Sequence, residues 1–224
     1  MIRRDYILRM IEECVQRLAR IAALKRSQQW DEAATTLDAE FQRLVGAGAQ
    51  AVARLSETEL LVRLMEGEPT QAVRHKTLVI TTLLKEAGDV AAAQNQPDER
   101  RACYLKALHL LLDTLARGEV FEFPEFVPKV EMLVAALADD ALPIRTHAAL
   151  MQYHERTGAF AKAEDALFAM LEVEPANAAL VEFGLTFYDR VLAQSEAALN
   201  AGNLPRAEAE EGRKELQNRQ RLAG

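Results

Sequence analysis

Four histidines and two cysteines are the residues of this sequence best suited to hold a metal ion or to attack a substrate. His147 and His154 lie two helical turns apart with Met151 between them, whereas histidines that share a metal on one helix are usually four residues apart. Cys14 and Cys103 are far apart, lack a Cys-x-x-Cys partner and stand among apolar residues. We therefore expect packing or surface roles for the histidines and buried, reduced thiols for the cysteines.

Carboxylates gather in the segment 118–128, where Glu119, Glu122 and Glu125 alternate with phenylalanines. Such acids can bind a cation or act as general acid and base, which makes a metal-dependent enzyme one hypothesis. The chain has 34 acidic residues, however, so acid pairs also arise by chance. Glycine-rich phosphate loops and the Gly-x-Ser-x-Gly nucleophile elbow are absent from the sequence. We expect a protein that is not an enzyme and that has no cofactor.

The composition favours helices. Alanine (39), leucine (31) and glutamate (24) dominate the 224 residues, against 10 glycines and 7 prolines. The net charge of −7 argues against a nucleic-acid partner, because binding phosphates requires concentrated lysine and arginine. No apolar run is long enough for a membrane helix, and the start does not resemble a signal peptide. With few cysteines as well, we expect a cytoplasmic protein without integral membrane association.

Apolar residues recur with the helical period over almost the whole chain. Ser56 and Glu59 have the spacing of a capping box, Pro97 suits the first turn of a helix, and Asp31 is expected to cap the second helix. The predicted helices span about 3–27, 31–46, 57–66, 70–94, 97–117, 128–138, 143–157, 160–172, 177–200 and 204–221. These ten helices, joined by short turns, make five antiparallel pairs in a single all-α domain over residues 1–224.

One glycine turn and the helix after it have the spacing of a known repeat. Gly158 precedes Phe160, and Ala163 follows three residues later. Small residues let two helices approach closely, while the aromatic ring fills the gap beside the turn. This spacing resembles the second helix of a tetratricopeptide repeat, a helix–turn–helix unit of about 34 residues, and the best match covers residues 144–177. The resemblance implies an irregular tetratricopeptide-like (TPR-like) α-solenoid, with residues 204–221 as its polar cap.

Two other resemblances accompany this one. Residues 139–148, with Asp139 and Asp140 ahead of Arg145, resemble the start of a HEAT-type helix, so a HEAT-like array is the alternative to a TPR-like one. Residues 5–11 resemble the start of an uncharacterised bacterial protein family of unknown function. That likeness implies no activity.

In tetratricopeptide proteins, the first helix of each pair lines a concave groove that holds a peptide or protein partner. The family's groove positions, transferred to this sequence, fall on Arg145, Gln152, Glu155, Arg156, Glu182, Phe183, Asp189 and Arg190. The resemblance therefore implies a non-catalytic scaffold that binds a protein or peptide. An alternative is a structural homo-oligomer, such as a homodimer, assembled through the amphipathic helix at about 3–27 without a separate ligand.

Overall fold

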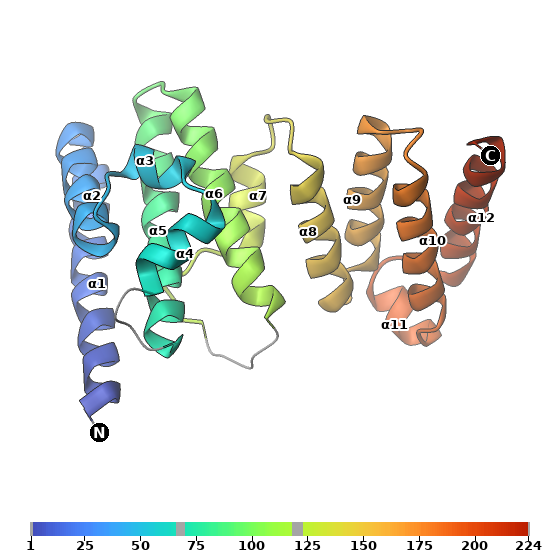
Figure 1. The fold of residues 1–224 in the computed structure, drawn as a ribbon, viewed down its shortest axis with the longest axis horizontal. Coiled ribbons are helices and arrows are strands. Elements are labelled where there is room, and N and C mark those ends of the chain that lie inside the picture. Colours follow the sequence, from blue (N-terminus) through green and yellow to red (C-terminus); the bar gives the residue numbers. More distant parts are fainter. Residues whose placement is uncertain (1, 66–69, 118–122, 224) are drawn as a thin grey trace. The chain divides into compact units, whose positions relative to one another are not determined.

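A computed structural model describes residues 2–65, 70–117 and 123–223 of the chain. All regular secondary structure in these ranges is α-helical, without a strand, as the composition predicts (Figure 1). The chain forms two compact units, unit 1 over Met1–Asp140 and unit 2 over Ala141–Gly224.

The helices of each unit follow one another along the chain. Unit 1 holds α1 (Ile2–Arg26), α2 (Trp30–Val45), α3 (Ala49–Arg54), α4 (Glu57–Met65), α5 (Thr70–Ala93), α6 (Pro97–Ala116) and α7 (Val130–Ala136). Unit 2 holds α8 (Ile144–Arg156), α9 (Phe160–Val173), α10 (Ala178–Leu192), α11 (Glu196–Ala201) and α12 (Arg206–Ala223).

The described residues thus form twelve helices, two more than the sequence predicts. The prediction of one helix over 177–200 is wrong, because α10 ends at Leu192 and Ser195 caps a new helix, its hydroxyl accepting a hydrogen bond from the Ala198 amide at 3.2 Å. Helix α3 has only 6 residues, too few for a periodic pattern to reveal. The other nine predicted helices are confirmed, with ends that differ by no more than about two residues.

Two of the three predicted helix starts are confirmed. The Ser56 hydroxyl accepts from the Glu59 amide at 3.1 Å, and the Glu59 carboxylate accepts from the Ser56 amide at 2.9 Å, which completes the capping box. Pro97 lies in the first turn of α6. The prediction that Asp31 caps α2 is wrong: Asp31 lies inside the first turn, and its carboxylate accepts from the Gln94 side chain at 2.8 Å.

Helix α5 forms the centre of unit 1 and contacts α1, α2, α3, α4 and α6. Its buried threonines do not break the core, because each hydroxyl donates to the carbonyl four residues earlier: Thr77 to Val73 at 2.9 Å and Thr81 to Thr77 at 2.9 Å. Gly88 allows the close approach of α6, since a β-carbon there would lie 2.5 Å from the Tyr104 ring. Gly88 and threonines whose hydroxyls are hydrogen-bonded therefore let neighbouring helices pack around most of α5.

A network of ionic side chains joins α1, α5 and α6 in unit 1. Lys25 on α1 pairs with Glu86 at 2.5 Å and also with Asp89, both on α5. Lys85 pairs with the same two carboxylates at 3.0 and 2.9 Å, and the Tyr104 hydroxyl of α6 donates to Asp89 at 2.7 Å. Burial alone would raise the pKa of Asp89, but the hydrogen bonds from Lys25, Lys85 and Tyr104 outweigh it and lower that pKa. The two positive and two negative charges balance.

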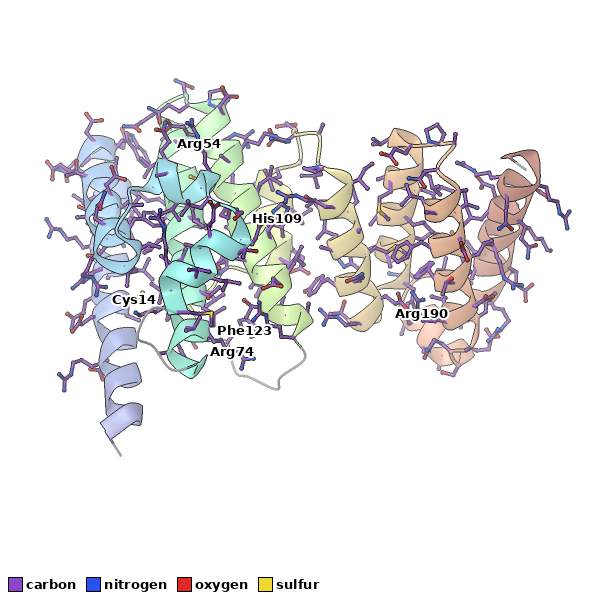
Figure 2. All side chains as sticks on the ribbon, in the orientation of Figure 1. Cys14, Arg54, Arg74, His109, Phe123 and Arg190 are labelled. Atoms are coloured by element: carbon purple, nitrogen blue, oxygen red, sulfur yellow. The ribbon has the colours of Figure 1, made fainter. Side chains whose placement is uncertain are left out.

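A second ion pair ties α4 to α6. Lys106 is buried; its ammonium donates to the Glu57 carboxylate at 2.9 Å and to the Leu55 carbonyl. The ring of His109 lies 3.3 Å from the same Glu57 oxygen (Figure 2). Burial opposes ionisation of Glu57, but the Lys106 hydrogen bond and the amide at the helix start lower its pKa to about 2.

We expect this pair to make unit 1 sensitive to acid. The pKa of Glu57 is about 2 in the folded chain and near its ordinary 4.5 when unfolded, so its stabilisation is present above about pH 4.5 and is lost as the pH falls toward 2. Glu57→Gln should therefore lower the urea midpoint of unit 1 at pH 7 and have a smaller effect at pH 3. Fluorescence of Trp30, the single tryptophan, follows the transition. An equal loss at both pH values would contradict the ionic role of Glu57.

Unit 2 is built from a helix pair, α8 and α9, and from α10, which contacts α9 and α12. Phe160 and Ala163, the residues of the repeat spacing, are both buried. Phe187 and Tyr188 of α10 are completely buried, and the Tyr188 hydroxyl donates to Glu164 of α9 at 2.5 Å. The interior of unit 2 is therefore held by aromatic side chains and small crossing residues.

Glu164 is in an unfavourable electrostatic position in unit 2. Burial raises its pKa, and the nearby carboxylates of Glu208, Asp165 and Glu215 raise it further, although the Tyr188 hydrogen bond opposes them. A raised pKa means that ionised Glu164 favours the unfolded chain at neutral pH, and that this cost disappears on acidification below the ordinary carboxyl pKa.

Glu164→Gln is consequently expected to stabilise unit 2 at pH 7. The amide oxygen of glutamine can still accept from Tyr188, so the variant removes the charge and keeps the hydrogen bond. We expect the melting temperature to rise by about 1–2 °C at pH 7, with no gain at pH 3.5. Circular dichroism melts measure both, with Glu210→Gln, at an exposed position of α12, as the matched control. A lower melting temperature at pH 7 would show that the charge is favourable.

Candidate functional site

The residues predicted to line a groove lie on two helices of unit 2. Helix α8 carries Arg145, Gln152, Glu155 and Arg156, and α10 carries Glu182, Phe183, Asp189 and Arg190. Six of these side chains are exposed, whereas Glu155 and Phe183 are half-buried. On each helix the spacing puts them on one side, so together they define what we call the α8–α10 face.

One ion pair joins the two helices of this face. The guanidinium of Arg190, which Figure 2 labels, donates to the Glu155 carboxylate. The distances are 2.6 Å through Nε and 2.8 Å through Nη2, a bidentate arrangement. The hydrogen bonds that Arg190 donates to Glu155 raise the pKa of Arg190. The structure therefore brings together two of the residues that the sequence predicts for the groove.

Three of the other predicted residues, Gln152, Glu182 and Asp189, take no part in this ion pair. Asp189 pairs with Arg213 of α12 at 2.7 Å, away from the Glu155–Arg190 pair. The side chains of Gln152 and Glu182 make no hydrogen bond with any residue in the described ranges. With three arginines and three acids, the predicted residues carry no net charge, and the aromatic ring of Phe183 lies half-buried among them. A surface of this kind suits a polar partner that carries an apolar group.

Where the structure describes them, the residues considered for metal or nucleophilic chemistry do not assemble into a metal site. Among the residues that the structure describes, no three His, Cys, Asp or Glu side chains are grouped to hold a metal ion. Glu119 and Glu122 lie outside the described residues, and Glu125 is exposed. Both cysteines are free and buried as predicted; burial raises the pKa of Cys14 to about 11 and that of Cys103 to about 12. Both thiols are therefore protonated and unreactive at neutral pH.

His147 and His154 both lie on α8. His147 is half-buried, and burial lowers its pKa. His154 is half-buried as well, with its ring 5.1 Å from that of Tyr153.

Within the described ranges, no helix has the length and apolar character needed to cross a membrane.

Comparison with known families matches residues 1–221 to a family of unknown function, DUF6483. The chain belongs to this family. No curated protein and no solved structure matches the sequence or the fold. Membership in DUF6483 brings no activity with it, just as the resemblance of residues 5–11 brings none. None of the comparisons shows tetratricopeptide-like repeats, so the function must be inferred from the side chains themselves.

The sequence did not predict a pocket that this DUF6483 chain has in unit 1, between α2, α3, α5 and α6. Its lining includes four residues of α3, a helix that periodicity does not reveal, and six of the fifteen lining residues are alanines. Alanine is so frequent in this sequence that no pattern marks the alanines that line a space. The pocket depends on how the helices pack and not on a motif.

Proposed function

We propose that this chain is a non-catalytic scaffold that binds a protein or peptide on the α8–α10 face, within an irregular TPR-like array. The observation that carries the proposal is the bidentate Glu155–Arg190 pair, which places a polar side chain of α8 next to one of α10. Helices that follow one another in this way, each the first of its pair, form the binding surface of helical repeats. Burial of Phe160 and Ala163 supports the same arrangement.

The chemistry of the face favours a partner with both charges and one apolar side chain. Arg190 is exposed, and an exposed ion pair contributes only about 0.2–1 kcal/mol, so Arg190 can exchange Glu155 for a carboxylate of the partner at little cost. Phe183, already half-buried, offers an aromatic contact of the type that dominates binding energy at interfaces. A polar peptide segment with a single apolar anchor meets both conditions.

The proposal includes a cytoplasmic location. Cys14 and Cys103 are free thiols in the interior of unit 1. Free cysteines of this kind are typical of proteins in a reducing compartment.

Affinity capture from native cell extract, quantified by mass spectrometry, tests the scaffold. The variant combines Arg145→Ala, Phe183→Ala and Arg190→Ala, and the control combines Arg117→Ala, Met132→Ala and Arg219→Ala at half-buried or exposed positions off the face. We expect specific partners of the wild-type chain to fall at least tenfold with the face variant and to persist with the control. Full retention by the face variant, with an unchanged circular dichroism spectrum, would refute this face.

A further inference from the structure

Unit 1 contains a pocket of about 280 Å³ between α2, α3, α5 and α6. Its floor is apolar and consists of short, buried side chains: Leu37, Ala53, Ala87, Val90, Ala91 and Cys103. The volume falls just below the range of roughly 300–1,000 Å³ that holds drug-sized ligands. The pocket therefore fits a smaller molecule with an apolar part of a few carbon atoms.

Charged side chains of opposite sign line the same pocket. Arg54, the last residue of α3, is labelled in Figure 2 and is exposed. Its guanidinium makes no hydrogen bond or ion pair with any described residue. Glu99 lies on α6, and one of its carboxylate oxygens accepts from the Gln50 amide of α3. Arg54 and Glu99 form no ion pair with each other. The lining thus offers one cation, Arg54, and two carboxylates, Glu99 and Asp38, and Arg54 pairs with neither carboxylate.

The carboxylate of Glu99 acts electrostatically on the floor of the pocket. Burial and, second to it, the charge of Glu99 together raise the pKa of Cys103 to about 12, so the thiol on the floor stays neutral. A negative charge close enough to influence Cys103 also favours a positive group inside the pocket. Arg54 favours a negative group, because guanidinium binds carboxylates with two parallel hydrogen bonds.

We propose that this pocket binds a free α-amino acid with an apolar side chain. The carboxylate of the ligand pairs with Arg54, its ammonium pairs with Glu99, and its side chain lies on the apolar floor. Glu99 and the oxygen of the Gln50 amide can both accept hydrogen bonds from the ammonium. This site lies in unit 1 and does not depend on the α8–α10 face.

Isothermal titration calorimetry of the full chain at pH 7 tests the site with three probes. L-leucine carries both charges, N-acetyl-L-leucine lacks the ammonium, and L-leucinamide lacks the carboxylate. We expect L-leucine to bind and each of the other two to bind at least tenfold more weakly, because each leaves one charge of the pocket without its partner. No heat from L-leucine at 10 mM, or equal affinity for all three probes, would overturn the proposal.

Three variants assign the roles of the lining residues. Arg54→Gln and Glu99→Gln keep the size of each side chain and remove its charge, and each should weaken L-leucine binding at least tenfold. Ala102→Leu, at a half-buried lining position, should fill the pocket and abolish binding. The control is Arg20→Gln, at an exposed position of α1 outside the pocket, which should bind like the wild type. Undiminished binding by Arg54→Gln and Ala102→Leu, with unchanged circular dichroism, would place any leucine elsewhere.

Discussion

Asp89→Ala is expected to lower the free energy of unfolding of unit 1 by about 3 kcal/mol. Asp89 accepts from the Tyr104 hydroxyl at 2.7 Å and neutralises both Lys25 and Lys85. Without the carboxylate, the buried Tyr104 hydroxyl loses its acceptor, and Glu86 alone faces two ammonium groups. An intact, balanced ionic network contributes little to the free energy of unfolding. The cost of the substitution arises because it leaves polar groups at the α1–α5–α6 contact without partners.

A surface carboxylate provides the matched control for Asp89. Asp113 on α6 pairs with Arg117 at 2.7 Å, but both side chains are about half exposed, at 48% and 56%. Asp113→Ala should therefore cost less than about 0.5 kcal/mol. Urea unfolding followed by Trp30 fluorescence gives both values. Equal losses for the two variants would mean that solvent satisfies the Asp89 network and that it does not hold unit 1 together.

The extent of the helices could be predicted because local signals agreed with packing. The capping box at Ser56 and the proline at 97 act through the backbone next to them, so they work in the same way whatever surrounds the helix. Asp31 was misassigned because an aspartate at the capping position and one in the first turn have the same chemistry, and the Asp31 carboxylate instead contacts Gln94, which follows α5. The break between α10 and α11 was missed because apolar residues continue across it.

The candidate sites were less predictable, since they depend on contacts between helices. The sequence named Glu155 and Arg190 but could not show that they pair, because 35 residues separate them. It gave no sign that Asp189 would face Arg213 instead. The pocket of unit 1 was even harder to predict from the sequence, because an alanine that lines a pocket has the same local sequence pattern as an alanine at a close helix crossing.

Gly202→Ala is expected to cost unit 2 about 3 kcal/mol, for a reason that the repeat spacing does not contain. Gly202 follows α11 with φ −82°, which any residue can adopt. A β-carbon there would lie 2.5 Å from the Gly158 carbonyl oxygen and would also meet the Phe160 ring. The Gly202 carbonyl in turn accepts from the Ala161 amide at 3.0 Å. Because backbone touches backbone here, no side chain can move aside to relieve the contact.

Gly158→Ala separates this steric effect from backbone conformation. Gly158 has φ +75°, which is unfavourable for other residues, but a β-carbon there would meet nothing within 4 Å. The expected cost is about 1–2 kcal/mol, smaller than that of Gly202→Ala. Hydrogen exchange of the Ala161 amide should accelerate more in the Gly202 variant, because that substitution displaces its acceptor. If Gly158→Ala proved the more damaging of the two, the turn conformation, and not the contact of this turn with α11, would be what holds unit 2 together.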